Sequence, residues 1–555
     1  MKVPWIAVAA LVAVAAVAAP RRGATEDPAI RVGESIYLHG VLGSGAEIEG
    51  TRKSVGMSTK GVGAACVNCH QHSGLGSKEG AILIPPVTGE YLFHQRGHGH
   101  EAGAPVLPYV ESMHGNRDPY TDVTLARAIR EGVDSQGRAL GDVMPRFALN
   151  DADMASLIEY LKSLSAQRVP GVTDTLLHFA TIFTPDSDPV KRAGVRDVLE
   201  HYFAEKNAFP FGPSPTLWTS TKTEYAKSMY MAHRHWQLHV WQLEGPAVTW
   251  RAQLDKHLAQ EPVFAVISGL GGSNWAPVHE FCQQNAVPCL FPNVEVPVIA
   301  DGDFYPLYFS KGVFLESELI AKKILDARQD GGSGPVNVYQ VYRSGDSGEP
   351  AAKALAAQLQ GQAGFTVHSQ ILTGTPEQGL PKALRVAQNA QVLVLWLRGP
   401  DLAALGSIPV RSATVYVSGL LGGLENSPVP ASWRARAELT YPFDLPDKRG
   451  VRLDYPLGWF SFRRIPVVAL QAQADTYLAC SLVTDVLNNH VADSFVRPYL
   501  IEQLQGMLER RIITGYYPHL ALATNQRFAS KGAYLAHFTD TQGTRLTADS
   551  DWTVP

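Results

Sequence analysis

Three residues that can hold a metal cofactor stand together in the stretch Cys66-Val67-Asn68-Cys69-His70. In a C-x-x-C-H motif, the two thiols can bond covalently to the vinyl groups of a haem while the histidine ligates its iron. A thioredoxin-like redox pair would instead need a βαβ context, and a zinc site would need two further ligands at close spacing. The zinc alternative stays open because more histidines follow: His72, His94, His98, His100 and His114.

An iron bound by His70 needs a sixth ligand, and the sequence predicts Met144, in Met144-Pro145-Arg146-Phe147. A thioether in that position raises the reduction potential relative to a second histidine. Met57 and Met113 are the alternative ligands. A helix is predicted just after Met144, because Asn150 can cap its start and apolar residues then recur at spacings of three and four. These apolar residues are Met154, Leu157, Ile158, Leu161 and Leu164.

With these motifs, residues 28–166 resemble a class I cytochrome c. In that family the first and last helices cross, and a small residue lets aromatic side chains approach closely. Gly33 and Tyr37 match the spacing of the first helix, and Leu157 and Tyr160 match that of the last. The resemblance implies an all-α domain with one covalent haem c, bound through Cys66 and Cys69.

Ile84-Pro85-Pro86-Val87-Thr88-Gly89 resembles the stretch of that family in which a proline carbonyl accepts the N–H of the axial histidine. This bond would fix the tautomer of His70. The segment from Arg96 to Tyr120 is longer than a minimal cytochrome needs, so the sequence does not predict what covers the haem edge there.

The N-terminus carries a secretory signal, predicted to span residues 1–24, with Lys2 before an apolar run that ends in small residues. No other run approaches about 18 uninterrupted apolar residues, so we expect no membrane span in the mature chain. Haem c attachment outside the cytoplasmic membrane indicates the bacterial periplasm. The formal charge of −4 and the ordinary composition give no basic footprint for nucleic acid.

The 555 residues exceed what one cytochrome needs. A Pro-Gly turn marks residues 167–175 as a linker, and short β-branched runs then alternate with helical segments over residues 176–555, as in a parallel α/β sheet. The predicted strands are 177–183, 263–268, 336–342, 365–371, 392–397 and 413–418.

The glycine-rich turn Gly269-Leu270-Gly271-Gly272-Ser273 lacks the G-x-G-x-x-G spacing of a dinucleotide loop. Residues 176–540 are instead similar to type I periplasmic binding proteins of the branched-chain amino-acid receptor kind, through Phe264-Ala265-Val266-Ile267-Ser268-Gly269 and Tyr305-Pro306-Leu307-Tyr308-Phe309-Ser310-Lys311-Gly312. The resemblance implies a bilobal α/β domain with a solute cleft between the lobes. The predicted fold is therefore multidomain, an all-α class I cytochrome c followed by this bilobal domain.

By the same resemblance, the cleft candidates are Ser268, Ser273, Asn274, Asn293 and Tyr342. In those receptors, a serine and loop N–H groups at a helix start hold the ligand carboxylate. They also need an acidic side chain for the ligand ammonium, and Tyr416-Val417-Ser418-Gly419-Leu420-Leu421 offers none. The cleft is therefore predicted to take a small polar or anionic solute, unless these polar residues merely close loops and cap helices.

Three cysteines remain outside the haem motif. Cys282 and Cys289 are close enough in sequence for a disulfide if their Cα atoms come within about 7 Å, and the sequence leaves this open. Cys480, in an apolar helical run, is predicted to be a buried free thiol.

The main functional hypothesis is an electron-transfer protein rather than an enzyme, because no substrate-side acid–base set can be assembled from the spacing. Its partner would be a periplasmic dehydrogenase or another cytochrome. The binding-protein-like domain would dock the electron carrier to that partner or tune the carrier for it. The alternative is a periplasmic solute receptor, of the ABC-transporter type, with a haem redox sensor.

Overall fold

The computed structural model describes residues 27–52, 55–79, 82–94, 117–164, 169–208, 234–329, 334–409, 413–488, 495–540 and 543–555. Several predicted features lie outside these residues: the signal, Met113, and three of the histidines considered for zinc, His98, His100 and His114. Most of the segment 96–120 and the first two residues of the predicted linker also lie outside them. No described helix is long and apolar enough to cross a membrane.

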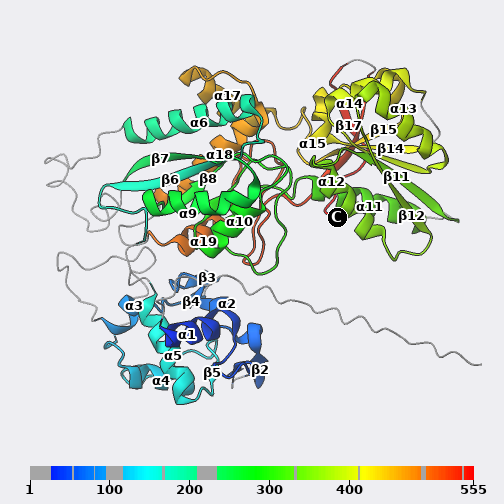
Figure 1. Cartoon of the computed structure of the whole chain (residues 1–555). Helices are drawn as coiled ribbons and strands as arrows, with labels where there is room; N and C mark the ends of the chain where they lie inside the picture. The colour runs from blue at the N-terminus through cyan, green and yellow to red at the C-terminus, as the bar shows by residue number, and fades with distance from the viewer. Residues whose placement is uncertain are drawn as a thin grey trace, which may run out of the picture.

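The N-terminal region is a small helical domain around one core (Figure 1). Its helices are α1 Pro28–His39, α2 Val67–His70, α3 Gly89–Phe93, α4 Asp122–Glu131 and α5 Asp151–Ser163, with the 3-10 turn η1 Gly61–Ala64. Short strands connect them: β1 Glu49–Arg52, β2 Met57–Lys60, β3 Ser77–Glu79, β4 Ile82–Ile84 and β5 Arg146–Phe147. As predicted, Asn150 caps α5 by accepting the N–H of Asp153 at 2.8 Å.

Helices α1 and α5 cross at Gly33, as the sequence predicts. A Cβ at Gly33 would lie 2.1 Å from the carbonyl oxygen of Ser156, so only glycine allows this approach. The rings of Tyr37 and Tyr160 meet across the crossing with centroids 5.3 Å apart.

The first lobe of the C-terminal region is built on a parallel sheet in the order β10-β9-β8-β6-β7. Its strands are β6 Leu176–Phe183, β7 His235–Gln242, β8 Ala265–Ile267, β9 Cys289–Leu290 and β10 Pro306–Leu307. Helices α6 Pro189–Ala208, α9 Trp250–Gln260, α10 Ala276–Gln284, α17 Gly450–Arg463, α18 Leu470–Asn488 and α19 Arg497–Leu508 surround it.

The second lobe holds the sheet β12-β11-β13-β14-β15-β16-β17, in which β16 and β17 are antiparallel to their neighbours. The strands are β11 Val336–Tyr342, β12 Phe365–Ile371, β13 Val392–Trp396, β14 Thr414–Ser418, β15 Ala437–Tyr441, β16 Tyr534–Phe538 and β17 Leu546–Ala548. The helices are α11 Val313–Gln329, α12 Gly348–Leu359, α13 Pro376–Val386, α14 Gly399–Ala403, α15 Gly419–Gly422 and α16 Ala431–Arg434.

Both faces of the second sheet are covered. Along β13, Leu393 and Leu395 join one apolar cluster, whereas Val394 and Trp396 join another on the opposite face. This double burial explains why the parallel strands read as continuous apolar runs in the sequence. The chain passes between the lobes three times, after β10, after β15 and before β16. The predicted bilobal α/β architecture is confirmed.

Two cysteine predictions are settled. Cys282 and Cys289 form a disulfide with their Cα atoms 6.0 Å apart, joining the end of α10 to β9. Cys480 is a fully buried free thiol in α18.

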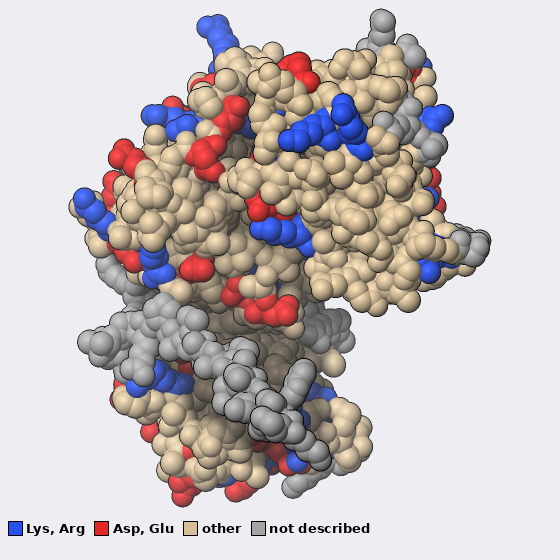
Figure 2. Space-filling view, turned by 45° about the vertical axis from the view of Figure 1, so that its right-hand side comes forward, with Lys and Arg blue, Asp and Glu red and all other residues tan. Residues whose placement is uncertain are grey.

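The haem-motif domain lies against the first lobe, below α19 in Figure 1. Arg497, at the start of α19, donates to the carbonyl oxygens of Val263 at 2.6 Å and of Pro170 in the linker at 3.4 Å. The face drawn in Figure 2 carries Lys and Arg interspersed with Asp and Glu, in agreement with the near-balanced charge of the sequence.

Candidate haem site

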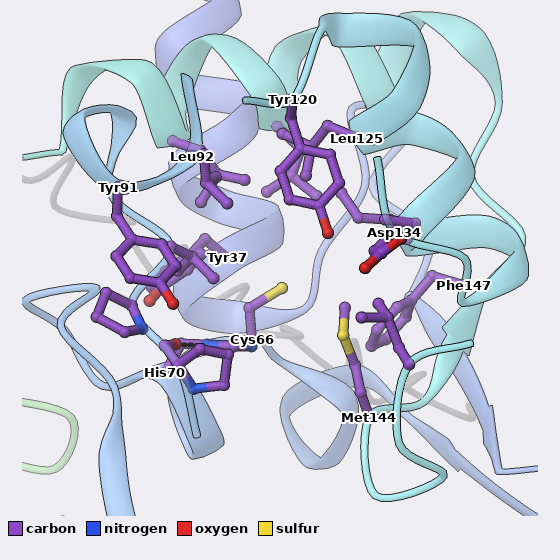
Figure 3. Close-up of a pocket in the computed structure, with 18 of the residues that line it drawn as sticks. Tyr37, Cys66, His70, Tyr91, Leu92, Tyr120, Leu125, Asp134, Met144 and Phe147 are labelled. Atoms are coloured by element: carbon purple, nitrogen blue, oxygen red, sulfur yellow. Dashed lines mark hydrogen bonds between the residues drawn. The ribbon is translucent and has the colours of Figure 1, made fainter. Parts of the chain in front are cut away.

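A cavity of about 400 Å³ opens in the N-terminal domain, and it brings the distant parts of the motif together. Cys66, His70 and Met144 all line it. Figure 3 shows the sulfur of Cys66 pointing into the cavity and the Met144 sulfur reaching in on the side opposite His70. Most other lining residues are apolar, among them Ile48, Leu125, Ile129, Phe147, Leu157 and Leu161.

His70 is held in the tautomer that a metal ligand needs. Its Nδ1 donates to the carbonyl oxygen of Pro85 at 2.9 Å, as predicted from the sequence. Burial lowers the pKa of His70, although this hydrogen bond acts in the opposite direction. The imidazole therefore stays neutral and keeps the Nε2 lone pair free for iron.

The cysteines occupy one short turn, α2, with Cys66 at its start and Cys69 three residues later. Both are free of disulfides. Burial raises the pKa of the Cys66 thiol to about 12, so the apolar cavity keeps it uncharged. An uncharged sulfur also suits the thioether that haem attachment would leave there.

Met144 lies in a loop that Arg146 stabilises by donating to the carbonyl oxygens of Met144 and, at 3.1 Å, of Leu140. The rival ligand Met57 is 45% exposed on β2 and is not among the residues that line the cavity. Among the described residues, the geometry thus favours Met144 over Met57.

The cavity lining also includes polar residues that the sequence reasoning did not single out, namely Arg117, Asp134 and Arg138. Arg117 lies 4.3 Å from the ring centre of Tyr120, and Arg138 donates to Asp134 at 2.8 Å. Although burial opposes it, hydrogen bonds from Arg138 hold the pKa of Asp134 below its usual range. Arg117 and Arg138 are the cationic lining residues that could pair with the haem carboxylates.

The cavity therefore fits a haem, with the Cys66 thiol for attachment, with His70 and Met144 as candidate axial ligands, and with an apolar wall. Cys69, the second thiol of the motif, lies in the same short turn but is not among the residues that line the cavity. Within the part of the chain that the structure describes, no group of three or more His, Cys, Asp or Glu side chains is arranged to hold a metal ion. This argues against zinc among those residues.

Residues 60–165 match the family model for cytochrome c. The chain carries a cytochrome c domain. No curated protein matches the chain.

Several solved structures are similar to the α/β region. A fatty acid ABC transporter substrate-binding protein from Thermomonospora curvata is 15% identical, with a TM-score of 0.46 over 70% of this chain and 95% of that chain. A leucine-binding protein from Thermotoga maritima is 11% identical, with a TM-score of 0.46 over 67% and 98%. A branched-chain amino acid ABC transporter from Thermus thermophilus with bound valine is 9% identical, with a TM-score of 0.48 over 69% and 97%.

In the α/β domain, the structure brings only some of the cleft candidates together. Ser268 lies 2.8 Å from the hydroxyl of Thr476, and Asn293 donates to Ser268 at 3.1 Å. Asn274 accepts the N–H of Ala276 at the start of α10, a helix-capping role. Tyr342 lies in the second lobe, where it packs into the core cluster on one face of the sheet.

In the glycine-rich turn at residues 269–273, side chains of the chain itself accept the backbone N–H groups. The Asp186 carboxylate accepts the N–H of Ser273 at 3.0 Å, and Thr184 accepts that of Gly272 at 3.1 Å. These N–H groups are the ones predicted to hold a solute carboxylate, so the chain satisfies them internally. The sequence pattern gave no sign of this contact, because Asp186 follows a different strand.

An ion pair also bridges the two lobes. Arg398, after β13, binds Glu295 at 2.7 Å and Asp346 at 2.6 Å, and Ser347 donates to Glu295 at 2.7 Å. Although burial opposes it, the contact with Arg398 lowers the pKa of Glu295. The Arg398 guanidinium and the Asp186 carboxylate thus both have partners supplied by the chain.

Proposed function

We propose that the protein is a periplasmic electron carrier with one haem c bound through Cys66 and Cys69 and with His70 and Met144 as axial ligands. The observation that carries the proposal is the cavity lined by Cys66, His70 and Met144, with Cys69 in the same short turn as Cys66 and His70. A haem there would accept and donate single electrons. Because the chain supplies both axial ligands, no open iron position remains for a substrate, which favours electron transfer over catalysis. A periplasmic dehydrogenase or another cytochrome would be its partner.

Haem stoichiometry tests this proposal. The full-length chain, expressed in a bacterium that matures c-type cytochromes, should carry one haem that stays attached after denaturation, because thioether bonds survive unfolding. The double variant C66A/C69A should lose the attached haem, whereas Cys480→Ala, which changes a buried cysteine far from the motif, should keep it. Purified protein with bound zinc and no haem would contradict the proposal.

In this proposal, the α/β domain docks or tunes the cytochrome domain. Two observations support such a role. The first lobe contacts the loop after His70, and Arg398 and Asp186 already have partners within the chain. A second candidate, a receptor for a small polar or anionic solute, is favoured by Asn293. Its Oδ1 is buried with no hydrogen-bond partner among the described residues, as expected where a ligand donor would bind.

Calorimetric titration of the full-length protein separates the two roles. We expect small carboxylates to give no binding heat with wild-type protein, because Asp186 already accepts the N–H of Ser273 and Thr184 that of Gly272. Asp186→Ala should release the N–H of Ser273 and allow carboxylates to bind. If wild-type protein binds a carboxylate or an amino acid and Asn293→Ala abolishes that binding, the receptor function takes precedence.

A further inference from the structure

The first lobe holds the loop that directly follows the haem motif. Glu502, in α19, accepts the N–H of Ser73 at 2.8 Å and the Ser73 hydroxyl at 2.6 Å. The ring of His72 stacks on Phe304 with centroids 3.8 Å apart and planes 20° apart. His72 and Ser73, two and three positions after His70, are thus held by residues 232 and 429 positions further along the chain.

The carboxyl group of Glu502 is enclosed at this contact, although the residue as a whole keeps partial exposure. The hydrogen bonds that it accepts from the described residues come from uncharged donors of the 72–73 segment. Burial raises the pKa of Glu502 to about 8, although these hydrogen bonds act in the opposite direction. A carboxylate without a cationic partner is costly to enclose, so the group can change its protonation state near neutral pH.

The charge of Glu502 also reaches the wall of the haem cavity. Tyr37 lines the cavity and donates to the carbonyl oxygen of Gln71 at 2.7 Å. Burial raises the pKa of Tyr37 most, and the negative charge of Glu502 is among the electrostatic causes that raise it further. The charge of Glu502 therefore acts on a residue that lines the cavity and is bonded to Gln71, the neighbour of His70.

We propose that Glu502 is a positioning residue for the haem loop and that its protonation is linked to haem reduction, so that the α/β domain tunes the reduction potential. The proposal rests on the proposed function, because it needs a haem at His70. When the redox partner supplies an electron to a haem held by His70, the Glu502 carboxylate would bind a proton from solvent more tightly, and loss of that electron would weaken this binding again.

The direction of the effect follows from charge. Oxidised iron carries one more positive charge than reduced iron, and a carboxylate nearby stabilises it. The potential is therefore lower where Glu502 is ionised, at high pH, and higher where it is protonated. Between these limits, the potential should fall as pH rises.

The titration of Glu502 can be distinguished from that of the neighbouring titratable groups. Burial lowers the pKa of His72 to about 4, so its ring stays neutral at the pH values of interest. Burial also lowers the pKa of Arg527, which lies beside Phe304, to about 10, opposed by the charge of Asp303. Tyr37 titrates well above its usual range. His39, exposed on α1, is the remaining group that acts on His72, and it is changed separately in the experiment below.

The experiment measures the midpoint potential of the holoprotein from about pH 6 to about pH 10, a range that spans the carboxyl titration. In wild-type protein, the midpoint potential should fall as pH rises. The plot of potential against pH should change slope where Glu502 titrates, and this change of slope is called the bend below. Glu502→Gln should keep the potential that wild-type protein has at low pH throughout the pH range in which Glu502 titrates. The amide is neutral at every pH and can still bond to Ser73 through both of its polar atoms. Ser73→Ala should move the bend to higher pH, because the carboxylate loses one donor.

Two controls accompany these variants. Glu509→Gln makes the same charge change at an exposed position just after α19, and His39→Gln removes the other neighbouring ring. Both should keep the bend. The proposal is overturned if Glu502→Gln retains the wild-type pH dependence, or if His39→Gln abolishes it. A chain without covalent haem would instead contradict the proposed function, so the two failures are distinguishable.

Discussion

Replacing Met144 by alanine should abolish the weak far-red sulfur-to-iron absorption band of the oxidised protein and lower its reduction potential. The thioether of Met144 enters the cavity on the side opposite His70 and is the predicted sixth ligand. A thioether favours reduced iron, so its loss lowers the potential by part of the roughly 0.8 V that axial ligands span. Absorption spectroscopy and a redox titration of the holoprotein measure both effects.

Met57→Ala is the matched control for this prediction. Met57 is 45% exposed on β2, outside the cavity lining, so its loss should leave the band and the potential unchanged. Met113→Ala tests the other methionine considered from the sequence, which lies outside the described residues. If the band persists in Met144→Ala and disappears in either control, the ligand assignment is wrong.

Local patterns predicted much of the cytochrome domain. The spacing of Cys66, Cys69 and His70 indicated the attachment motif, and the family resemblance of residues 84–89 predicted that a proline carbonyl there accepts the N–H of His70, which Pro85 does. Asn150 capping and the Gly33 crossing were also readable, since each depends on one residue type at a fixed helical position.

Contacts between distant segments could not be read in the same way. Asp186 meets Ser273 across 87 residues, and Glu502 meets Ser73 across 429. No sequence pattern singled out Asp186 or Glu502. Only the order of strands in the first sheet and the docking of α19 bring them to their partners. The same limit explains why the sequence favoured an anionic solute at a turn whose N–H groups the chain itself fills.

Gly33→Ala should destabilise the cytochrome domain by about 3 kcal/mol or more, at the upper end of the cost of overpacking a core. The new Cβ would lie 2.1 Å from the carbonyl oxygen of Ser156 and 2.6 Å from the Cβ of Tyr160. The first of these atoms is backbone and cannot rotate away, so α1 and α5 must separate. Denaturant unfolding followed by haem absorbance measures the effect, because a chain that loses its fold also loses the geometry that presents Met144.

Gly63→Ala provides the comparison within the same domain. A Cβ at Gly63 meets no atom within 4 Å, and its backbone lies outside the left-handed region. This variant should therefore change the free energy of unfolding by no more than about 0.5 kcal/mol. Equal stability of the two variants would mean that α1 and α5 can move apart at little cost. The crossing of the first and last helices would then not be what holds the haem cavity in shape.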